Sequence, residues 1–362
     1  MDIERKIELV KRKPTEEVVT DEDLRHIFET HNHPKHYIGF EISGQVHIGT
    51  GLCTALKVRD FLEAGIKPKI FLADYHSYIN QKLGGDLEKI REVANGYFKH
   101  AFVSLGMFDE SKVDFVLASD LYDSDYWKTV LKITKDTTIN RMLRCITIMG
   151  RKESEATSSA SIVYPAMQAA DIFMLDVQIA HAGMDQRKVH MLARELSHSY
   201  KKEFVAVHGH LLPGLKGSQR MSVPGTSSIQ EKSEIDIDAK MSKSKPDSAI
   251  FIHDSEDDIK RKIAKAACDP GITERNPIIE YAEYLVLRDK TMKIERPDKF
   301  GGDIEIANGA ELKSLYLEGK LHPMDLKNAV ARELIDALRP SREYFEKNKH
   351  YLDQISLKDV TR

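Results

Sequence analysis

Residues 36–64 read HYIGFE ISGQVHIGT GLCTALKVRDFLEA, three blocks with different properties. The first six residues predict a short strand of mostly apolar side chains. Residues 42–50 predict a turn that contains glycine, and residues 51–64 predict a helix that Gly65 ends. A strand that passes through a glycine-containing turn into a helix is the first half of a βαβ unit.

Further segments continue this alternation. Residues 69–74 (KIFLAD) and 113–118 (VDFVLA) predict two more strands, and the charged, amphipathic run 86–105 predicts a helix between them. Upstream, residues 20–23 (TDED) resemble a capping box and start another helix. Downstream, residues 204–207 predict one more strand. The order of elements indicates an α/β fold with a Rossmann-like parallel sheet.

The pattern changes after the third strand. From residue 123 to about 196 it is mostly helical, with a Ser/Thr/Glu-rich stretch at 152–161. Residues 211–239 have no clear period and predict a loop. After residue 250 the chain is again helical, with one helix that starts at Ser255 and another within residues 323–338. We therefore expect a Rossmann-like catalytic domain over 1–210 with a helical insertion near 123–180, a loop and linker over 211–250, and a mainly helical domain over 251–362.

The composition of the chain bears on its class of protein and its cellular compartment. The chain has 362 residues and a net charge of −3, so overall charge gives no sign of nucleic acid binding. Its three cysteines are far apart and form no CxxC pair, which excludes a disulfide framework and a cysteine zinc site. The first residues are charged, and no stretch approaches the roughly 18 apolar residues of a membrane span. We expect a soluble protein of the reducing cytoplasm.

The turn at 43–50, SGQVHIGT, lies where nucleotides bind in open α/β sheets. Gly44 and Gly49 allow a base to approach the backbone, and the start of the following helix offers free N–H groups to phosphate. His47 can donate a hydrogen bond to the same phosphate. Taken alone, a histidine beside glycine in a turn is more often structural.

A second motif, KMSKS at 240–244, follows the last predicted strand. Lys240 and Lys243 could neutralise charge on a pyrophosphate leaving group if their loop closes over a triphosphate. An isolated pair of this kind usually belongs to a solvated basic stretch. The two motifs together, in this order and on both sides of a Rossmann-like sheet, indicate more than either one alone.

Together the motifs are similar to the HIGH and KMSKS signatures of class I aminoacyl-tRNA synthetases. The resemblance implies that the turn holds ATP as substrate and that the lysines stabilise the transition state of adenylate formation. Mg²⁺ would arrive with ATP, without a metal bound by the protein itself. The sequence departs from the pattern at Thr50, where the family has its second histidine, and a hydroxyl carries no positive charge. The ATP-binding residues implied are Gly44, His47, Gly49, Thr50, Asp185 and Lys243, with His47, Lys240 and Lys243 as the catalytic residues.

Four further segments resemble tyrosyl-tRNA synthetases of the archaeal and eukaryotic type: YIGFE at 37–41, FLAD at 71–74, YPAMQAAD at 164–171 and GMDQRKVHMLAREL at 183–196. The resemblance implies that Tyr37 and Asp171 hold the substrate hydroxyl. Tyr164, Gln168 and Gln186 would hold the α-amino group, with Glu41 at the edge of the site, and Asp185 would bind the ATP ribose.

Helix geometry is compatible with this assignment, although an ordinary amphipathic helix with its polar residues facing water would show the same spacing. Tyr164, Gln168 and Asp171 are spaced i, i+4 and i+7, so they share one face of a helix. A buried carboxylate that pairs with a phenol rejects phenylalanine by roughly 10⁴- to 10⁵-fold, because phenylalanine would leave it unpaired.

Two segments beyond residue 250, RPDKFGGD at 296–303 and HPMDLK at 322–327, resemble the anticodon-binding domain of the same family. Phe300 is suited to stacking on a base, and Asp325 to accepting hydrogen bonds from guanine. The implied residues that bind tRNA(Tyr) are Arg187, at the acceptor-end base pair, and Phe300, His322 and Asp325, at the anticodon. The family is homodimeric through the helical insertion, which we expect here as well.

Two alternatives stay open. A tryptophanyl-tRNA synthetase would share the fold and both signatures, but indole needs more room and offers only a donor, whereas Tyr37 and Asp171 suit a phenol. A relative that binds RNA without catalysis would be consistent with Thr50. The intact lysines and the polar residues predicted for the pocket argue against it, because buried polar groups are costly without a ligand.

Overall fold

The computed structural model describes residues 1–150, 158–217, 241 and 246–355. Most of the predicted loop at 211–239, most of the Ser/Thr/Glu-rich stretch, Lys240 and Lys243 lie outside the described residues. The strands are β1 (Thr15–Val19), β2 (His36–Phe40), β3 (Lys69–Leu72), β4 (Asp114–Leu117), β5 (Ile179–Gly183), β6 (Val205–Gly209), β7 (Met292–Ile294) and β8 (Ile304–Ile306). The α-helices of the first half are α1 (Ile3–Lys11), α2 (Asp21–Thr30), α3 (Gly51–Glu63), α4 (Asp74–Ile79), α5 (Leu87–Val93), α6 (Lys99–Val103), α7 (Ala118–Leu121), α8 (Ser124–Asp136), α9 (Ile139–Cys145), α10 (Ser159–Met174) and α11 (Arg187–Ser197). Those of the second half are α13 (Glu256–Ala264), α14 (Pro277–Tyr281), α15 (Gly309–Leu317), α16 (Pro323–Lys347) and α17 (Lys349–Asp353).

The described residues contain a six-stranded sheet in the order β1-β6-β5-β2-β3-β4. All neighbouring strands are parallel except β1, which pairs with β6 in the antiparallel sense. The α/β fold with a parallel sheet is therefore confirmed. The predicted strands at 36–41, 69–74, 113–118 and 204–207 are present as β2, β3, β4 and β6, each within one or two residues.

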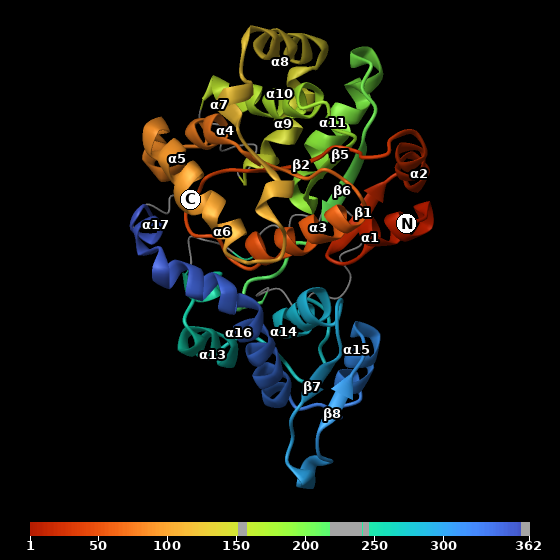
Figure 1. Cartoon of the computed structure of the whole chain (residues 1–362), viewed down its shortest axis with the longest axis vertical. Coiled ribbons are helices and arrows are strands. Elements are labelled where there is room, and N and C mark those ends of the chain that lie inside the picture. The colour runs from red at the N-terminus through yellow and green to blue at the C-terminus, as the bar shows by residue number, and fades with distance from the viewer. Residues whose placement is uncertain (151–157, 218–240, 242–245, 356–362) are drawn as a thin grey trace.

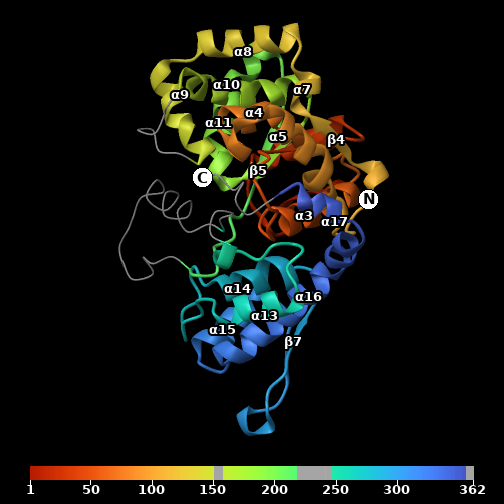
Figure 2. The ribbon, with the colours of Figure 1, turned by 90° about the vertical axis from the view of Figure 1, so that its left-hand side faces the viewer.

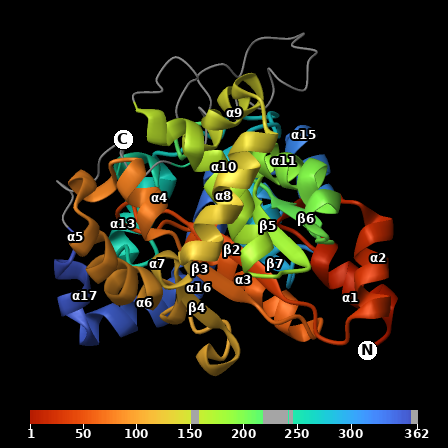
Figure 3. The same ribbon diagram turned by 90° about the horizontal axis from the view of Figure 1, so that it is seen from above.

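The side chains of each strand point alternately to two apolar cores, one on each face of the sheet. Tyr37 and Phe71 point to the side covered by α8, α10 and α11, and α10 packs against α8, α9 and α11 there (Figures 2 and 3). Their neighbours Ile38 and Ile70 point to the opposite side, toward α3 and the C-terminal half. Successive side chains of a strand face opposite ways, so Tyr37 lies on the same side of the sheet as α10.

Three features differ from the sequence prediction. β5 lies inside the region that we expected to be mostly helical, because five residues are too few to show a period and a helix precedes them directly. β1 was not predicted, since its sequence TEEVV is only partly buried. The single helix expected over 86–105 is divided into α5, a π-helical turn at Ala94–Phe98, and α6.

The C-terminal half is mainly helical and carries the β7–β8 hairpin at the end of the molecule far from the sheet (Figure 1). The predicted helix starts at Ser255 and Pro323 are confirmed as those of α13 and α16, whose caps are Ser255 and His322. α16 extends beyond the predicted residue 338 and passes through Pro340. The capping box at Thr20 is also present, because Thr20 accepts from the N–H of Asp23 and the Asp23 carboxylate accepts in return.

The last described helix returns to the sheet half. The side-chain oxygen of Gln354 accepts a hydrogen bond of 2.8 Å from the N–H of Tyr97 in the π-helical turn. Gly96 is required beside it, because a Cβ at this position would collide with the Gln354 side chain. His100 also stacks on Tyr351 at 4.1 Å between ring centroids. The C-terminal segment is therefore packed against the wall of the sheet half.

The two halves share a continuous apolar core and a buried ionic cluster. The N–H of Ile48 donates to the carbonyl of Ile250 at 2.9 Å, so the turn after β2 is paired with the start of the C-terminal half. The Asp60 carboxylate, fully buried on α3, contacts Arg288 from the C-terminal half and Lys57 from its own helix. The division of the chain at residues 210 and 250 stays a prediction.

His210 forms a second link between the halves. Its ring bridges Glu16 (3.3 Å) and Glu280 (2.7 Å) and stacks on Tyr284 with ring centroids 4.1 Å apart. Burial alone would lower the pKa of His210, but the hydrogen bonds to Glu16 and Glu280 outweigh it and raise the pKa to about 9. The imidazolium thus joins β1 to α14.

This link predicts a pH dependence of stability. A histidine whose pKa rises from 6.5 to about 9 on folding stabilises the protein fully below pH 6.5. That contribution, at most about 3 kcal/mol, is lost as the pH rises through 9. In urea titrations, the difference in unfolding free energy between the native chain and His210→Gln should shrink between pH 6.5 and 9.5. A constant difference would contradict a charged His210.

Among the described residues, no helix is long and apolar enough to cross a membrane. The three cysteines are all unpaired and buried.

Candidate functional site

A cavity of about 420 Å³ opens at the carboxyl ends of β2 and β5. The chain leaves β2 toward β3 on one side, whereas β5 and β6 lie on the other, so the cavity is at the point where the strand order reverses. Ligands bind at such points in open α/β sheets. The predicted residues that line it are Tyr37, Glu41, His47, Gly49, Thr50, Tyr164, Gln168, Asp171, Asp185 and Gln186.

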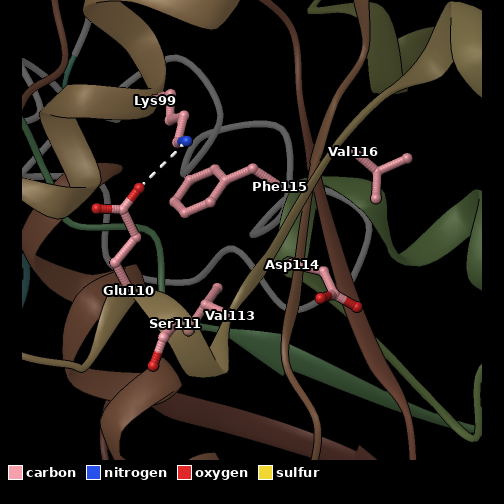
Figure 4. A pocket seen from close by; sticks show the side chains of 7 residues that line it. All are labelled: Lys99, Glu110, Ser111, Val113, Asp114, Phe115 and Val116. Carbon is pink, nitrogen blue, oxygen red and sulfur yellow. Dashed lines mark ion pairs between the residues drawn. The ribbon is translucent and has the colours of Figure 1, made fainter.

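A larger hollow, about 710 Å³, lies at the outer edge of the sheet beside β4 (Figure 4). Lys99 and Glu110 form an ion pair of 3.1 Å there, and the Lys99 ammonium lies 5.3 Å from the ring centre of Phe115. Asp114, the other charged residue of this hollow, lies 3.7 Å from Lys69, and none of the predicted site residues line it. We therefore take the cavity at β2 and β5 as the candidate site.

The turn after β2 is closely packed around His47. Gly44 has a φ of +103°, a conformation that favours glycine. A Cβ on Gly49 would approach the His47 ring to 3.2 Å, so glycine keeps this part of the turn close to the imidazole. The N–H of Thr50 donates to His47 Nδ1 at 3.2 Å, and the Thr50 hydroxyl lies 3.5 Å from Nε2. The hydroxyl therefore occupies the space next to His47 without adding charge.

A hydrogen bond to the π-helical turn at Ala94–Phe98 also holds the turn after β2 in place. The hydroxyl of Tyr97 accepts a hydrogen bond of 2.8 Å from the N–H of Val46. The N-terminus of α3 follows at Thr50, whose side chain does not cap it. The N–H groups of Gly51 and Cys53 donate to the carbonyls of His47 and Ile48. The positive end of the helix dipole still attracts phosphate, so the start of α3 suits the nucleotide end of the site.

Asp171 lies at the opposite end of the cavity, on α10, and is 2% exposed. Its Oδ1 accepts hydrogen bonds from the hydroxyls of Tyr122 (3.0 Å) and Tyr126 (3.1 Å). Burial raises the pKa of Asp171 to about 8 in spite of these two hydrogen bonds. Tyr37 is buried in the same cluster, and burial together with the Asp171 charge raises the pKa of Tyr37 well above its usual value.

The residues predicted to hold an α-amino group lie between these two ends. Glu41 Oε1 accepts from the Tyr164 hydroxyl and from Asn80, both at 2.8 Å. Gln168 donates to the side-chain oxygen of Gln186 at 3.2 Å. Carboxylate, phenol and amide oxygens thus converge, and such acceptors suit an ammonium group.

The second predicted motif reaches the cavity through Met241, the one residue of 240–244 that the structure describes. Met241 is 4% exposed, lines the cavity, and donates its N–H to the carbonyl of Leu212 at 3.0 Å. Nearby, Gly183 at the end of β5 leaves room for Asp185, because a Cβ on Gly183 would lie 2.8 Å from an Asp185 carboxylate oxygen.

The residues predicted to contact RNA lie outside the set that lines the cavity. Arg187 makes a bidentate ion pair with Glu17, with distances of 2.8–3.1 Å. Phe300 is 63% exposed near the tip of the β7–β8 hairpin. His322 caps α16, and Asp325 follows in its first turn. The Arg296 guanidinium donates a hydrogen bond of 2.8 Å to the carbonyl of Lys320, which lies just before α16. This bond links the β7–β8 hairpin to the start of α16.

Several polar residues that contact the predicted site residues were not predicted from the sequence. His76, Tyr122 and Tyr126 surround Asp171. Asn80 and Lys82 contact Glu41, the lysine at 3.6 Å. Tyr122 precedes α8 and Tyr126 lies in its first turn, so their four-residue spacing is not that of a helical i, i+4 pair and gave no periodic signal.

No group of three or more possible metal ligands occurs within the described ranges.

Comparisons with known proteins give the family and the fold of this chain. A family model described as tRNA synthetases class I (W and Y) matches residues 29–339. A tyrosine–tRNA ligase from Thermococcus sibiricus is 50% identical over 100% of both chains. The crystal structure of a tyrosyl-tRNA synthetase from Pyrococcus horikoshii, complexed with L-tyrosine, has a TM-score of 0.93 at 49% identity, covering 99% of this chain and 100% of that chain. The structure of the Aeropyrum pernix enzyme has a TM-score of 0.83 at 36% identity, covering 99% of each chain.

Proposed function

Because this chain belongs to the tyrosine–tRNA ligases of the class I aminoacyl-tRNA synthetase family, it activates L-tyrosine with ATP and transfers it to tRNA(Tyr), and we propose that both steps take place in the cavity at β2 and β5. The tyrosine side chain enters toward Asp171 and Tyr37. Its ammonium group lies among Tyr164, Gln168 and Gln186, next to Glu41.

ATP occupies the other end of the cavity. The turn with Gly44, His47 and Gly49 holds the phosphates together with Thr50, and Asp185 binds the ribose. The tyrosine carboxylate attacks the α-phosphate and pyrophosphate leaves, so the protein supplies position and electrostatic stabilisation without a covalent nucleophile. Lys240 and Lys243 stabilise the leaving group in this proposal, and Mg²⁺ enters with ATP as part of the substrate.

The burial of Asp171 among phenols carries the proposal. A carboxyl that is 2% exposed at the end of a cavity is costly unless a ligand completes its hydrogen bonds. A phenol hydroxyl does so, whereas the phenyl ring of phenylalanine does not. Indole brings a donor but no acceptor, and it is larger than phenol.

The test is ATP–pyrophosphate exchange with tyrosine, tryptophan and phenylalanine in parallel. We expect exchange with tyrosine, and a kcat/KM for phenylalanine that is lower by roughly 10⁴-fold. Preferred exchange with tryptophan would refute the assignment of the pocket. A lack of exchange with all three would favour a relative that binds RNA without catalysis, and would show that Thr50 is not tolerated.

For the RNA side we propose that Arg187 contacts the acceptor end and that the hairpin and α16 read the anticodon. Phe300 is well exposed for stacking, and Arg296 ties its hairpin to the chain before His322. Single-stranded bases are read by stacking and by hydrogen bonds to their edges. Asp325, in the first turn of α16, is suited to accept from guanine.

Asp325→Ala should separate the two half-reactions. We expect the KM for tRNA(Tyr) in aminoacylation to rise by roughly 10- to 100-fold, as for the loss of a hydrogen bond to a charged group. Tyrosine-dependent exchange should not change. Asp336→Ala, three turns further along α16, is the control with no expected effect, because the Asp336 side chain is 49% exposed. Equal effects of the two variants on KM would contradict a role of Asp325 in readout.

We propose a homodimer that associates through the helical insertion. Exposed apolar side chains gather there: Trp127 is 39% exposed, Leu131 69% and Ile139 68%. Leu131→Asp should convert the dimer to a monomer in sedimentation experiments, because an unpaired charge in an apolar interface is costly. A native chain that sediments as a monomer would contradict the dimer. A reducing cytoplasm, the compartment that we propose, suits three unpaired cysteines.

A further inference from the structure

Three side chains surround Asp171 in addition to those assigned above. The hydroxyls of Tyr122 and Tyr126 both donate to Oδ1, and the two rings stack with centroids 3.8 Å apart. The other carboxyl oxygen, Oδ2, lies 3.7 Å from Nε2 of His76. Nδ1 of His76 is 3.1 Å from the Tyr122 hydroxyl. The three groups His76, Tyr122 and Asp171 thus form a connected chain.

The position of the His76 proton follows from this chain. Burial lowers the pKa of His76 to about 3, so the ring is neutral and has one N–H. Tyr122 uses its only proton in the bond to Asp171, and its oxygen is left as an acceptor toward Nδ1. The single proton of His76 must therefore be on Nδ1, which donates to the Tyr122 oxygen. Nε2 is then an acceptor.

His76 lines the cavity, and its Nε2 is a buried atom without a hydrogen-bond partner within the part of the chain that the structure describes. The His76 side chain is 3% exposed. Because 3.7 Å is too long for a hydrogen bond, Asp171 does not satisfy this nitrogen. One oxygen atom placed off the line between them can lie at about 2.9 Å from both. The two atoms therefore form a cradle for a hydroxyl group.

We propose that Nε2 of His76 accepts the hydrogen bond of the substrate's phenol hydroxyl, and that Tyr122 is the positioning residue that keeps His76 in the accepting tautomer. This inference rests on the proposed binding of tyrosine with its hydroxyl at Asp171. It adds His76 to the residues that touch the substrate. It also predicts that Tyr122, which does not touch the substrate, affects selectivity through His76.

The protonation of Asp171 supports this assignment. Burial raises the pKa of Asp171 to about 8, so the carboxyl carries a proton at neutral pH in the free enzyme. With Oδ1 accepting from two tyrosines, that proton is on Oδ2. A protonated Oδ2 donates to the phenol oxygen, and the phenol hydrogen then needs another acceptor. His76 Nε2 is in place to receive it.

The expected consequence is selectivity for a donor at the para position. Phenylalanine or 4-fluoro-L-phenylalanine would fill the space beside Nε2 and leave this buried acceptor unpaired. Tyrosine pairs it. The two ligands 4-fluoro-L-phenylalanine and tyrosine are close in size, so the ratio of their kcat/KM values reports on the hydrogen bonds and little else.

The experiment measures this ratio by ATP–pyrophosphate exchange in the full chain. His76→Phe, which keeps a ring of similar size, should lower the ratio by roughly 10- to 100-fold. His76→Gln, whose amide oxygen can reach the position of Nε2, should retain most of it. Thermal melting of each variant identifies loss of folding. An unchanged ratio in a folded His76→Phe enzyme would overturn the inference.

Tyr122→Phe tests the tautomer separately. It frees Nδ1, and the ratio should fall by roughly 10-fold. In the double variant with His76→Phe the two effects should not add, because Tyr122 acts through His76. Tyr126→Phe is the matched control: it removes the other hydroxyl on Oδ1 without touching His76, so its effect should add to that of His76→Phe. Additive effects of Tyr122→Phe would overturn the role of Tyr122.

Exchange by the native chain distinguishes failure of the proposed function from failure of the inference about His76. If it shows no exchange with tyrosine, the proposed function itself is wrong. If it does, and His76→Phe keeps the full preference for tyrosine over 4-fluoro-L-phenylalanine, the proposed function holds and only the inference about His76 fails.

Discussion

Asp171→Ala should lower kcat/KM for tyrosine in ATP–pyrophosphate exchange by roughly a thousandfold or more, with little change for phenylalanine. The reason is that alanine removes the group that faces the substrate hydroxyl. It also leaves the hydroxyls of Tyr122 and Tyr126 without the acceptor that they share. The loss should therefore be confined to substrates with a polar para group.

Asp171→Asn is the matched control for this result. Its amide oxygen can still accept from Tyr122 and Tyr126, and its NH₂ group can donate toward His76 and the substrate. We expect a smaller loss for tyrosine than with alanine. An equal loss of kcat/KM for tyrosine and for phenylalanine in Asp171→Ala would mean that the substitution disturbs the cavity as a whole, which would contradict the selectivity argument.

Asp60→Ala should have the largest effect on stability, a decrease of about 3–5 kcal/mol in the free energy of unfolding. The Asp60 carboxylate is fully buried and contacts Lys57 at 3.3 Å, Arg12 at 3.4 Å and Arg288. Lys57 and Arg288 are each 1% exposed, so their charges would lose their buried partner. Burial already lowers the pKa of Lys57 to about 7, and without Asp60 this lysine would lose its proton.

Urea titration at pH 7 measures the effect. Arg59→Ala is the control, because Arg59 contacts Asp289 in the same region but is 37% exposed. An exposed ion pair contributes only about 0–1 kcal/mol. If the two variants shift the urea midpoint equally, the buried cluster does not hold the two halves together.

The sequence predicted those parts of the fold that local pattern controls. The strands β2, β3 and β4 have apolar runs bounded by glycine, proline or charge, and the caps at Thr20 and Ser255 depend on residues three positions apart. β5 lacked such a signal. Its residues Ile179 to Gly183 follow α10 closely, and a strand becomes recognisable only when β2 and β6 are placed on its two sides.

The same distinction applies to the site. Gly44, His47, Asp171 and Gln186 were found through motifs that are contiguous in sequence. His76 and Tyr122 were not, because they are related to Asp171 only by contacts of 3.7 Å and 3.0 Å across 95 and 49 positions of the chain. Partners of this kind, such as Asp60 with Arg288, are 228 residues apart and leave no periodic trace.

The packing of the last described helix has a consequence for how this protein should be handled. The side-chain oxygen of Gln354 accepts a hydrogen bond from the N–H of Tyr97. The Tyr97 hydroxyl in turn accepts one from the N–H of Val46, next to His47. Three hydrogen-bonded residues thus connect the C-terminal segment with the nucleotide turn. Trimming the chain before residue 349 would remove an anchor of the ATP site, although the cut lies more than 300 positions away from it in sequence. Purification tags and fusion partners therefore belong at the other terminus.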